Sequence, residues 1–114
     1  MSDYSYDAVL VDVHDGDTVT LDVDLGFSTT RRMHVRLFGI NSPEMSTDAG
    51  MPAREHLRSL LRGPGLVLMS IKDRADKYGD RYLGILWIGN KNMNQQMVDD
   101  GFAKSWDGKG VKPV

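Results

Sequence analysis

The sequence predicts a single, mainly β domain in which five strands form a small Greek-key barrel, with one helix between the third and fourth strands and a second near the end. Apolar residues alternate with polar ones through residues 9–37, which is the period of a strand, and then recur at helical spacing. The length of 114 residues suits one hydrophobic core. A composition of 40% apolar and 26% charged residues excludes wholesale disorder.

The first three strands are expected before residue 40. Valines at positions 9, 11 and 13 alternate with polar or smaller neighbours, which predicts a strand that ends at the Asp15-Gly16 turn. Residues 19–25 alternate in the same way and complete a hairpin with the first strand. A loop is expected at 26–30, and a third strand follows around 33–37.

The period changes after the Ser42-Pro43 step. Pro52 suits the first turn of a helix, whose apolar residues recur until Gly63-Pro64 stops it. Two more strands are expected at 66–73 and 81–88, and a charged loop joins them.

A short second helix completes the order. Asn92 can cap it with Gln95 as a capping-box partner, and Gly101 would end it. We therefore expect one domain over residues 1–106 and a loose tail over 107–114. Three strands, a helix, two strands and a helix is the connectivity of an OB-type barrel, although a flat sheet with helices on one side fits the same order.

Composition excludes several classes of function. The chain has no cysteine, so it has no disulfide, no thiolate nucleophile and no cysteine-ligated zinc. His14, His34 and His56 are expected on separate elements without ligand spacing, and we assign none of them to a metal. The apolar runs are too short to span a bilayer and no signal peptide is visible, so we expect a cytoplasmic protein unless a leader was removed.

The net charge of −2 is unevenly distributed. Residues 1–30 contain seven Asp and no Lys or Arg, whereas residues 31–81 contain ten basic and six acidic side chains. An acidic segment beside a basic one is what a site needs if carboxylates hold a cation and arginines hold an anion. A protein surface of mixed charge would show the same distribution.

Three polar clusters are not explained by core packing. Residues 15–18 (Asp-Gly-Asp-Thr) place two carboxylates around a glycine, which suits a hard cation and equally suits a hairpin turn. Residues 36–44 place Arg36 on the outer face of a strand and hold Glu44 beyond a proline. The structural alternative is a surface ion pair between Arg36 and Glu44, with an Asx turn at Asn41.

The third cluster, at residues 76–81, adds a tyrosine and a second arginine, and a solvated hairpin tip would also account for it. Taken together, the three clusters supply oxygen ligands for a divalent cation, two guanidinium groups for a phosphate and one carboxylate as a base. That set indicates phosphoryl transfer, which depends mainly on positioning and charge neutralisation.

These segments resemble the staphylococcal-nuclease-like (thermonuclease) family. Residues 15–19 are similar to its Asp-Gly-Asp-Thr-Val signature, and residues 36–44 to its Arg-Leu-x-x-Ile/Val-Asp-Thr/Ala-Pro-Glu segment. Residues 76–83 are similar to its Asp-Lys-Tyr-Gly-Arg-x-Leu segment, and residues 94–103 to its Asn-x-x-(Leu/Met)-Val-x-x-Gly-x-Ala helix. The resemblance implies an OB barrel and a Ca²⁺-dependent phosphodiesterase that cleaves DNA and RNA with little sequence specificity.

The resemblance also implies a calcium site. Asp17 would be a direct ligand, and Asn41 stands where the family usually has an aspartate ligand. The backbone carbonyl of Ser42 would be another ligand, and Asp15 would support the site without touching the ion.

For catalysis, the resemblance implies that Arg36 and Arg81 bind the scissile phosphate and that Glu44 is the general base or orients the attacking water. The products would be 3′-phosphate and 5′-hydroxyl ends. The implied partners are DNA and RNA, with single strands preferred, and we expect a monomer with no membrane interaction. The further substrate contacts implied are Lys77, Tyr78 and, as a base-stacking ring, Trp106.

The sequence departs from the family pattern in three places. Asn41 removes a negative charge from the calcium site, Asp80 is an extra residue before Arg81, and the chain ends where longer members add a helix. The alternative hypothesis is a catalytically silent OB module that binds nucleic acid or a protein partner.

Overall fold

The computed structural model describes residues 4–75 and 81–106, without the side chains of residues 72–75 and 81. The elements of this part of the chain are, in order, β1 (Tyr4–Asp15), β2 (Thr18–Gly26), β3 (Thr29–Leu37), β4 (Ile40–Asn41), α1 (Gly50–Leu61), β5 (Leu66–Ala75), β6 (Arg81–Ile88), β7 (Lys91–Asn92), α2 (Met93–Asp99) and β8 (Lys104–Ser105).

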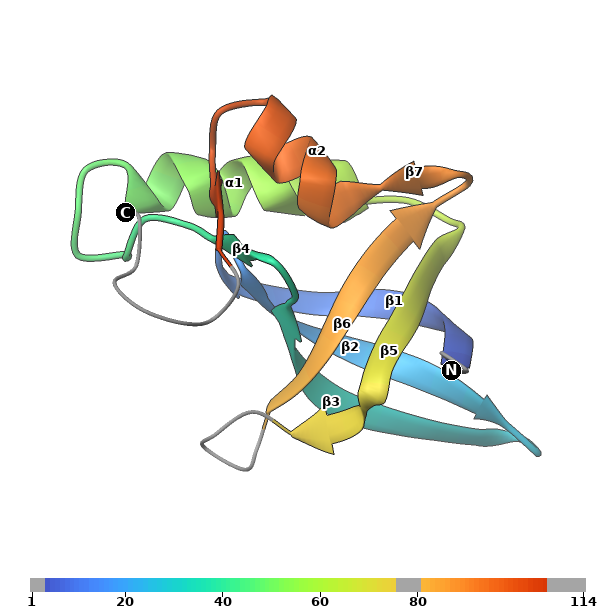
Figure 1. Ribbon diagram of the computed structural model, residues 1–114. Helices are drawn as coiled ribbons and strands as arrows, with labels where there is room; N and C mark the ends of the chain where they lie inside the picture. Colours follow the sequence, from blue (N-terminus) through green and yellow to red (C-terminus); the bar gives the residue numbers. More distant parts are fainter. Residues whose placement is uncertain (1–3, 76–80, 107–114) are drawn as a thin grey trace.

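Five of these strands close into a barrel (Figure 1). Strands β3, β2, β1, β5 and β6 pair in that order through antiparallel ladders. The circuit is completed where β3 pairs with β6 in parallel, from His34 opposite Arg81 to Leu37 opposite Gly84. This closure confirms the predicted OB-type barrel, and the alternative of a flat sheet is wrong.

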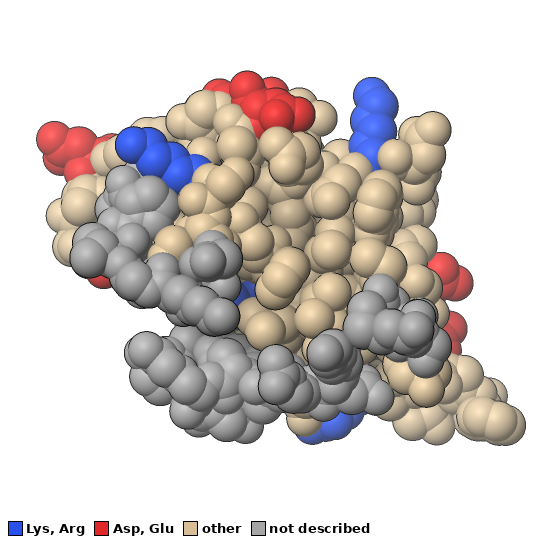
Figure 2. Space-filling view, in the orientation of Figure 1, with Lys and Arg blue, Asp and Glu red and all other residues tan. Residues whose placement is uncertain are grey.

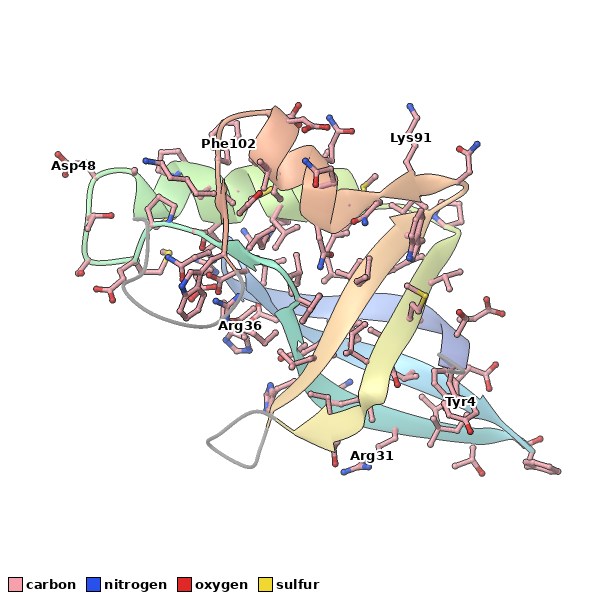
Figure 3. The ribbon with its side chains drawn as sticks, in the orientation of Figure 1. Tyr4, Arg31, Arg36, Asp48, Lys91 and Phe102 are labelled. Carbon is pink, nitrogen blue, oxygen red and sulfur yellow. The ribbon has the colours of Figure 1, made fainter. Side chains whose placement is uncertain are left out.

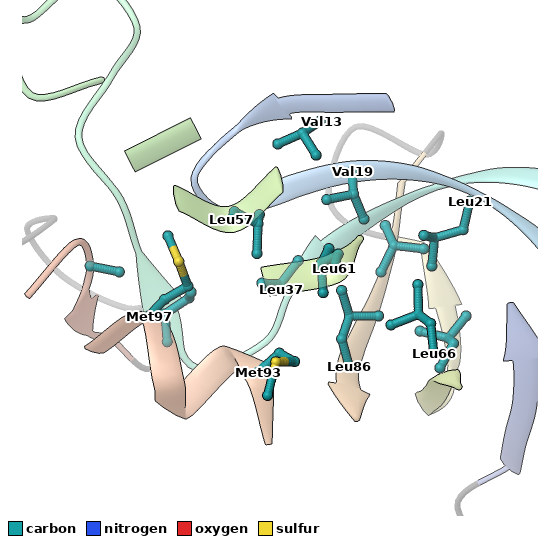
Figure 4. Packing of buried hydrophobic residues seen from close by; sticks show 14 of the residues in the cluster. Val13, Val19, Leu21, Leu37, Leu57, Leu61, Leu66, Leu86, Met93 and Met97 are labelled. Atoms are coloured by element: carbon teal, nitrogen blue, oxygen red, sulfur yellow. The ribbon is translucent and has the colours of Figure 1, made fainter. Parts of the chain in front are cut away.

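The core fills the barrel and continues under the helices (Figure 4). Strand residues such as Val19, Leu21 and Leu86 are fully buried inside the barrel. Helix α1 adds Leu57 and Leu61, which alternate with exposed positions at helical spacing. Both helices lie at the same end of the barrel (Figure 1), and α2 contributes two buried methionines, Met93 and Met97. Neither helix in the described residues is long and apolar enough to cross a membrane.

Strand β1 changes face along its length, which simple alternation does not predict. Val13 is fully buried, but Val9 and Val11 are 67% and 40% exposed. The register with β2 shifts between Leu10 and Asp12, so the residues before the shift face the core at even positions. Half-buried Tyr6, Ala8 and Leu10 accordingly pack against the core in place of the first two valines.

Two other expectations about local structure need correction. The loop predicted at 26–30 is shorter, because β2 and β3 leave only Phe27 and Ser28 between them, both with positive φ. Asn92 caps α2 as expected by accepting a hydrogen bond from the Gln95 amide at 3.1 Å. The Gln95 side chain, however, does not complete a capping box and instead donates to Asp99 at 2.9 Å.

The parallel seam of the barrel depends on a close approach at Gly84. A Cβ there would lie 2.4 Å from Leu68 Cδ1 and 3.2 Å from Val35 Cγ1. The carbonyl of Gly84 also accepts hydrogen bonds from the Phe38 amide at 2.8 Å and from the Asn94 side chain at 3.1 Å. Gly84 therefore allows β6 to pack closely against side chains of β3 and β5, and this packing completes the closure.

Gly84→Ala should destabilise the protein by about 1–3 kcal/mol, because the added methyl group overpacks the seam. Urea unfolding followed by circular dichroism measures the change. Val9→Thr, at an exposed position of the same barrel, is the control and should stay within about 0.5 kcal/mol of the wild type. Equal stability of Gly84→Ala and wild type would show that the seam can relax without cost.

Candidate active site

The turn between β1 and β2 places the carboxylate of Asp17 inside the protein, with 6% of the residue exposed. Its Oδ1 accepts from the Thr18 hydroxyl at 3.1 Å, and its Oδ2 accepts from the Ser42 amide at 2.9 Å. The Arg36 guanidinium lies 3.4 Å from the same Oδ2. One buried carboxylate therefore holds together a turn, a barrel strand and the loop that follows β4.

Arg36 is fixed where β3 passes into β4 (Figure 3). One terminal nitrogen donates to the carbonyls of Leu37 and Ile40, each at 3.1 Å. The other terminal nitrogen donates to Asn41 Oδ1 at 3.3 Å. Within the described residues, Nε–H and one remaining terminal N–H make no hydrogen bond, so this edge of the guanidinium can still bind an anion through two donors.

The structural alternative of a surface pair between Arg36 and Glu44 is wrong, because Arg36 pairs with Asp17. Arg36 lies on the predicted outer face of β3, but its side chain is only 13% exposed. The strand alternation gave the correct face, whereas the burial comes from β4 and the chain beyond it.

Asn41 and Ser42 are both buried beside Asp17. The pairing of Asn41 with Lys104 ties this segment to β8, and the Asn41 amide donates to the Ser42 carbonyl at 3.3 Å. Ser42 Oγ is buried, and no described residue gives it a hydrogen-bond partner. A Cβ at Gly16 would lie 2.6 Å from Ser42 Cβ, so the glycine allows the two segments to meet.

Glu44 and Trp106 border this cluster in different ways. The Glu44 side chain is exposed, and its backbone carbonyl accepts from the Thr47 hydroxyl at 2.6 Å and from the Thr47 amide at 3.0 Å. The Trp106 ring lies over the Arg36 guanidinium, 5.9 Å from ring centre to Cζ. The Trp106 amide donates to the Gly39 carbonyl at 2.8 Å, which holds the ring beside the site.

The remaining predicted residues are not all placed. Lys77 and Tyr78 lie outside the described residues. The backbone of Arg81 begins β6 and pairs with His34 on β3, two positions from Arg36. The Arg81 side chain is not among those described. The structure thus brings together Asp15, Asp17, Arg36, Asn41 and Ser42.

The two aspartates of the turn differ in acidity. Burial raises the pKa of Asp15 to about 6, and a hydrogen bond from its protonated form to Asp17 and repulsion between the two charges add to the shift. Burial also opposes ionisation of Asp17, but the hydrogen bond from Asp15, the Arg36 charge and the Ser42 amide outweigh it and lower the pKa of Asp17. Asp17 is therefore the stronger acid of the pair.

Three groups of this cluster offer oxygens that suit a hard cation: the Asp17 carboxylate, the Asn41 side-chain carbonyl and the Ser42 backbone carbonyl. Nitrogens of Arg36 and Asn41 already contact these oxygens. The described side chains bring few negative charges to this site. Within the described part of the chain, no three His, Cys, Asp or Glu side chains converge as a metal site. A divalent cation bound here would be held largely by neutral oxygens.

Two histidines that the sequence analysis expected on separate elements lie together next to this cluster. His14 and His34 both contact the Thr20 hydroxyl, and their ring centres are 5.5 Å apart. Their pairing across β2 was not predicted, because His14 comes from the irregular end of β1, where its register with β2 shifts. Alternation along β2 does put Thr18 and Thr20 on one face. That placement was the signal in the sequence from which a polar cluster on this face could have been inferred.

Comparisons with known proteins agree with the resemblance of the motifs. The model of the staphylococcal nuclease homologue family matches residues 34–111. Two curated proteins, each named "Uncharacterized endonuclease" and found in Escherichia coli O157:H7 and in Escherichia coli, are 27% identical over 119 aligned residues. Each alignment covers 97% of this chain and 72% of the relative.

The raised pKa of Asp15 predicts how stability changes with pH. The folded-state pKa of about 6 lies above the ordinary 3.8, so this carboxyl favours folding at low pH and that contribution is lost as pH rises through 6. Asp15→Asn imitates the protonated form, so it should stabilise the protein at pH 7 by roughly 1 kcal/mol, after allowance for partial exposure. At pH 4 it should have little effect.

Urea unfolding at both pH values, with a chelator present, measures this difference. Asp48→Asn, which removes a carboxylate at an exposed position in the loop before α1, is the control. An Asp15→Asn protein less stable than wild type at pH 7 would contradict the assignment.

Proposed function

Because this chain belongs to the family of staphylococcal nuclease homologues, we propose that it is a nuclease that hydrolyses phosphodiester bonds of DNA and RNA with the help of Ca²⁺. The observation that carries this proposal is the meeting of Asp17, Arg36 and Asn41 in one partly buried site. The names of its two endonuclease relatives support nucleic acid as the substrate.

Arg36 would bind the scissile phosphate. Its contacts with the Leu37 and Ile40 carbonyls fix the plane of the guanidinium and leave two N–H groups for the non-bridging phosphate oxygens. Because the side chain is ordered before substrate arrives, little rotamer entropy would be lost on binding. Arg81 would be the second arginine, and the pairing of its backbone with His34 starts β6 beside the strand that carries Arg36.

Asp17, Asn41 and the Ser42 carbonyl would hold the cation, and Asp15 would support Asp17 from behind. When Asp15 is ionised, the only hydrogen bond that Asp17 Oδ1 accepts among the described residues comes from Thr18, so this oxygen keeps a lone pair for a metal. When bound, Ca²⁺ would supply positive charge next to the phosphoryl oxygens as negative charge develops there.

Glu44 would take the proton of the attacking water. The water oxygen forms a bond to phosphorus, the P–O5′ bond breaks, and the leaving 5′ oxygen takes up a proton, leaving 3′-phosphate and 5′-hydroxyl ends. The exposed position of Glu44 next to the buried Ser42 segment is compatible with access to solvent water. Arg81 would favour departure of the 5′ oxygen.

Long-range charge contributes little to substrate binding in this proposal. The net charge is −2, and on the face shown in Figure 2 the described Lys and Arg side chains lie apart from one another. Affinity would therefore come from local contacts, including the Trp106 ring beside Arg36 as a stacking surface for a base.

We expect cleavage of heat-denatured DNA and of RNA with Ca²⁺ and no cleavage with a chelator. Arg81→Ala should abolish activity, and Glu44→Gln should slow it by about 100-fold or more, because a positioned base contributes at least that factor. Gel assays of end products measure both changes. Arg62→Ala and Asp48→Asn, which remove exposed charges near the two ends of α1, are the matched controls.

Cleavage that survives in chelator would contradict the role of the cation. Binding of DNA without cleavage in Ca²⁺, Mg²⁺ or Mn²⁺ would instead support the silent OB module and reject the enzyme.

Asn41→Asp should tighten calcium binding about tenfold, because it adds a negative charge to a site that has few. Isothermal titration calorimetry with Ca²⁺ measures the affinity without any need for activity. Asn90→Asp, at an exposed turn, makes the same change in net charge and should leave the affinity unchanged. Equal calcium affinities for Asn41→Asp and wild type would remove Asn41 from the ligand set.

A further inference from the structure

Two exposed histidines and a buried threonine form a second polar cluster beside the candidate active site. Thr20 Oγ1 lies 2.7 Å from His14 Nε2 and 2.9 Å from His34 Nδ1. Thr20 is 5% exposed, so one buried hydroxyl fixes the orientation of two exposed imidazole rings. Neither the catalytic role proposed for Arg36 nor the proposed cation site uses this cluster.

The hydrogen bonding restricts the tautomers of the two rings. A hydroxyl has one proton, so Thr20 can donate to only one ring, and at least one ring must donate its N–H to the hydroxyl oxygen. Where the hydroxyl donates to a ring, that ring carries its proton on the other nitrogen. Within the described residues, the remaining nitrogens, His14 Nδ1 and His34 Nε2, have no hydrogen-bond partner, so they are available to a ligand.

The cluster continues the line of Arg36 along the outer face of the barrel. On β3, His34 lies opposite Thr20 and Arg36 lies opposite Thr18, so the two side chains share a face. Residues two apart on a strand are separated by about 6.8 Å. That separation is comparable to the spacing of successive phosphates in an extended nucleic-acid strand, and a strand bound at Arg36 would bring its next phosphate to the histidines.

On the basis of the nuclease function proposed above, we propose that His14, Thr20 and His34 form a subsite for the phosphate adjacent to the scissile one. The ring that accepts from the Thr20 hydroxyl donates its other N–H to that phosphate, and the ring that donates to Thr20 does so as well when both of its nitrogens carry a proton. The subsite acts on substrate binding and not on the chemical step, since it lies one phosphate away from the reacting atoms.

The test compares substrates of different length on the His14→Gln/His34→Gln double variant. Steady-state kinetics are measured on an oligothymidylate and on a chromogenic thymidine ester with one phosphodiester group. KM for the oligothymidylate should rise roughly tenfold, because hydrogen bonds to a charged group are lost. The change on the ester should be much smaller. His56→Gln is the matched control, because it changes the third histidine of the chain, which lies on α1.

A substrate scan locates the contact. The oligothymidylate is prepared with one phosphate at a time replaced by a neutral methylphosphonate. At one position beside the cleaved bond, this replacement should weaken binding to the wild type and have no further effect on the double variant. If KM of the double variant rose equally for the ester and the oligothymidylate, the histidines would have a structural role and the subsite would be rejected. Unchanged kinetics on both substrates would also reject it.

Fluorescence anisotropy with a labelled oligothymidylate separates this proposal from the nuclease assignment. If the wild type cleaves neither substrate, the nuclease proposal fails, but weaker binding by the double variant than by His56→Gln still supports a phosphate contact. Equal binding by the two variants rejects the subsite whether or not the protein is an enzyme.

Discussion

The buried carboxylate of Asp17 is the constraint on which the arrangement of the site depends. It accepts hydrogen bonds from Thr18 and from the Ser42 amide and lies 3.4 Å from the Arg36 guanidinium. Thr18 directly follows Asp17 in the chain, whereas Arg36 and Ser42 come from the end of β3 and from the segment after β4. Because an unpaired buried charge is costly, each contact favours the one packing in which all of them form. Gly16 makes that packing possible, since a side chain there would collide with Ser42.

This arrangement also means that the site is largely formed without a cation. Arg36 supplies the positive charge that Asp17 needs, and its contacts with backbone carbonyls hold it in place. The cost is that Arg36 and a cation share the same oxygens, including Asn41 Oδ1. Under the proposed function, a cation at Asn41 Oδ1 would compete with that one contact, while the Leu37 and Ile40 carbonyls would still hold the guanidinium in place.

Local patterns predicted the fold well, because strand and helix periods are properties of neighbouring residues. They placed Arg36 on the outer face of β3 and the cap of α2 at Asn92. They failed where the outcome depends on distant parts of the chain. The register shift in β1 exposes Val9 and Val11, and the burial of Asp17 gives Arg36 a partner other than Glu44. The ordered motifs indicated which residues belong to one site, but the contacts among them arise where the turn after β1 meets the end of β3 and the segment after β4.

The two threonines of β2 connect the site to the surface beside it. Thr18 and Thr20 are on the outer face of the strand, yet both are almost fully buried. Thr18 directs its hydroxyl to Asp17, and Thr20 directs its hydroxyl to the two imidazoles, so each threonine orients a group above it. Valine at position 18 would remove one of the hydrogen bonds to Asp17, and valine at position 20 would remove the hydroxyl that both imidazoles contact, while the strand and the volume would be kept. The two threonines are therefore better explained by the polar side chains that their hydroxyl groups orient than by a contribution to the stability of the barrel.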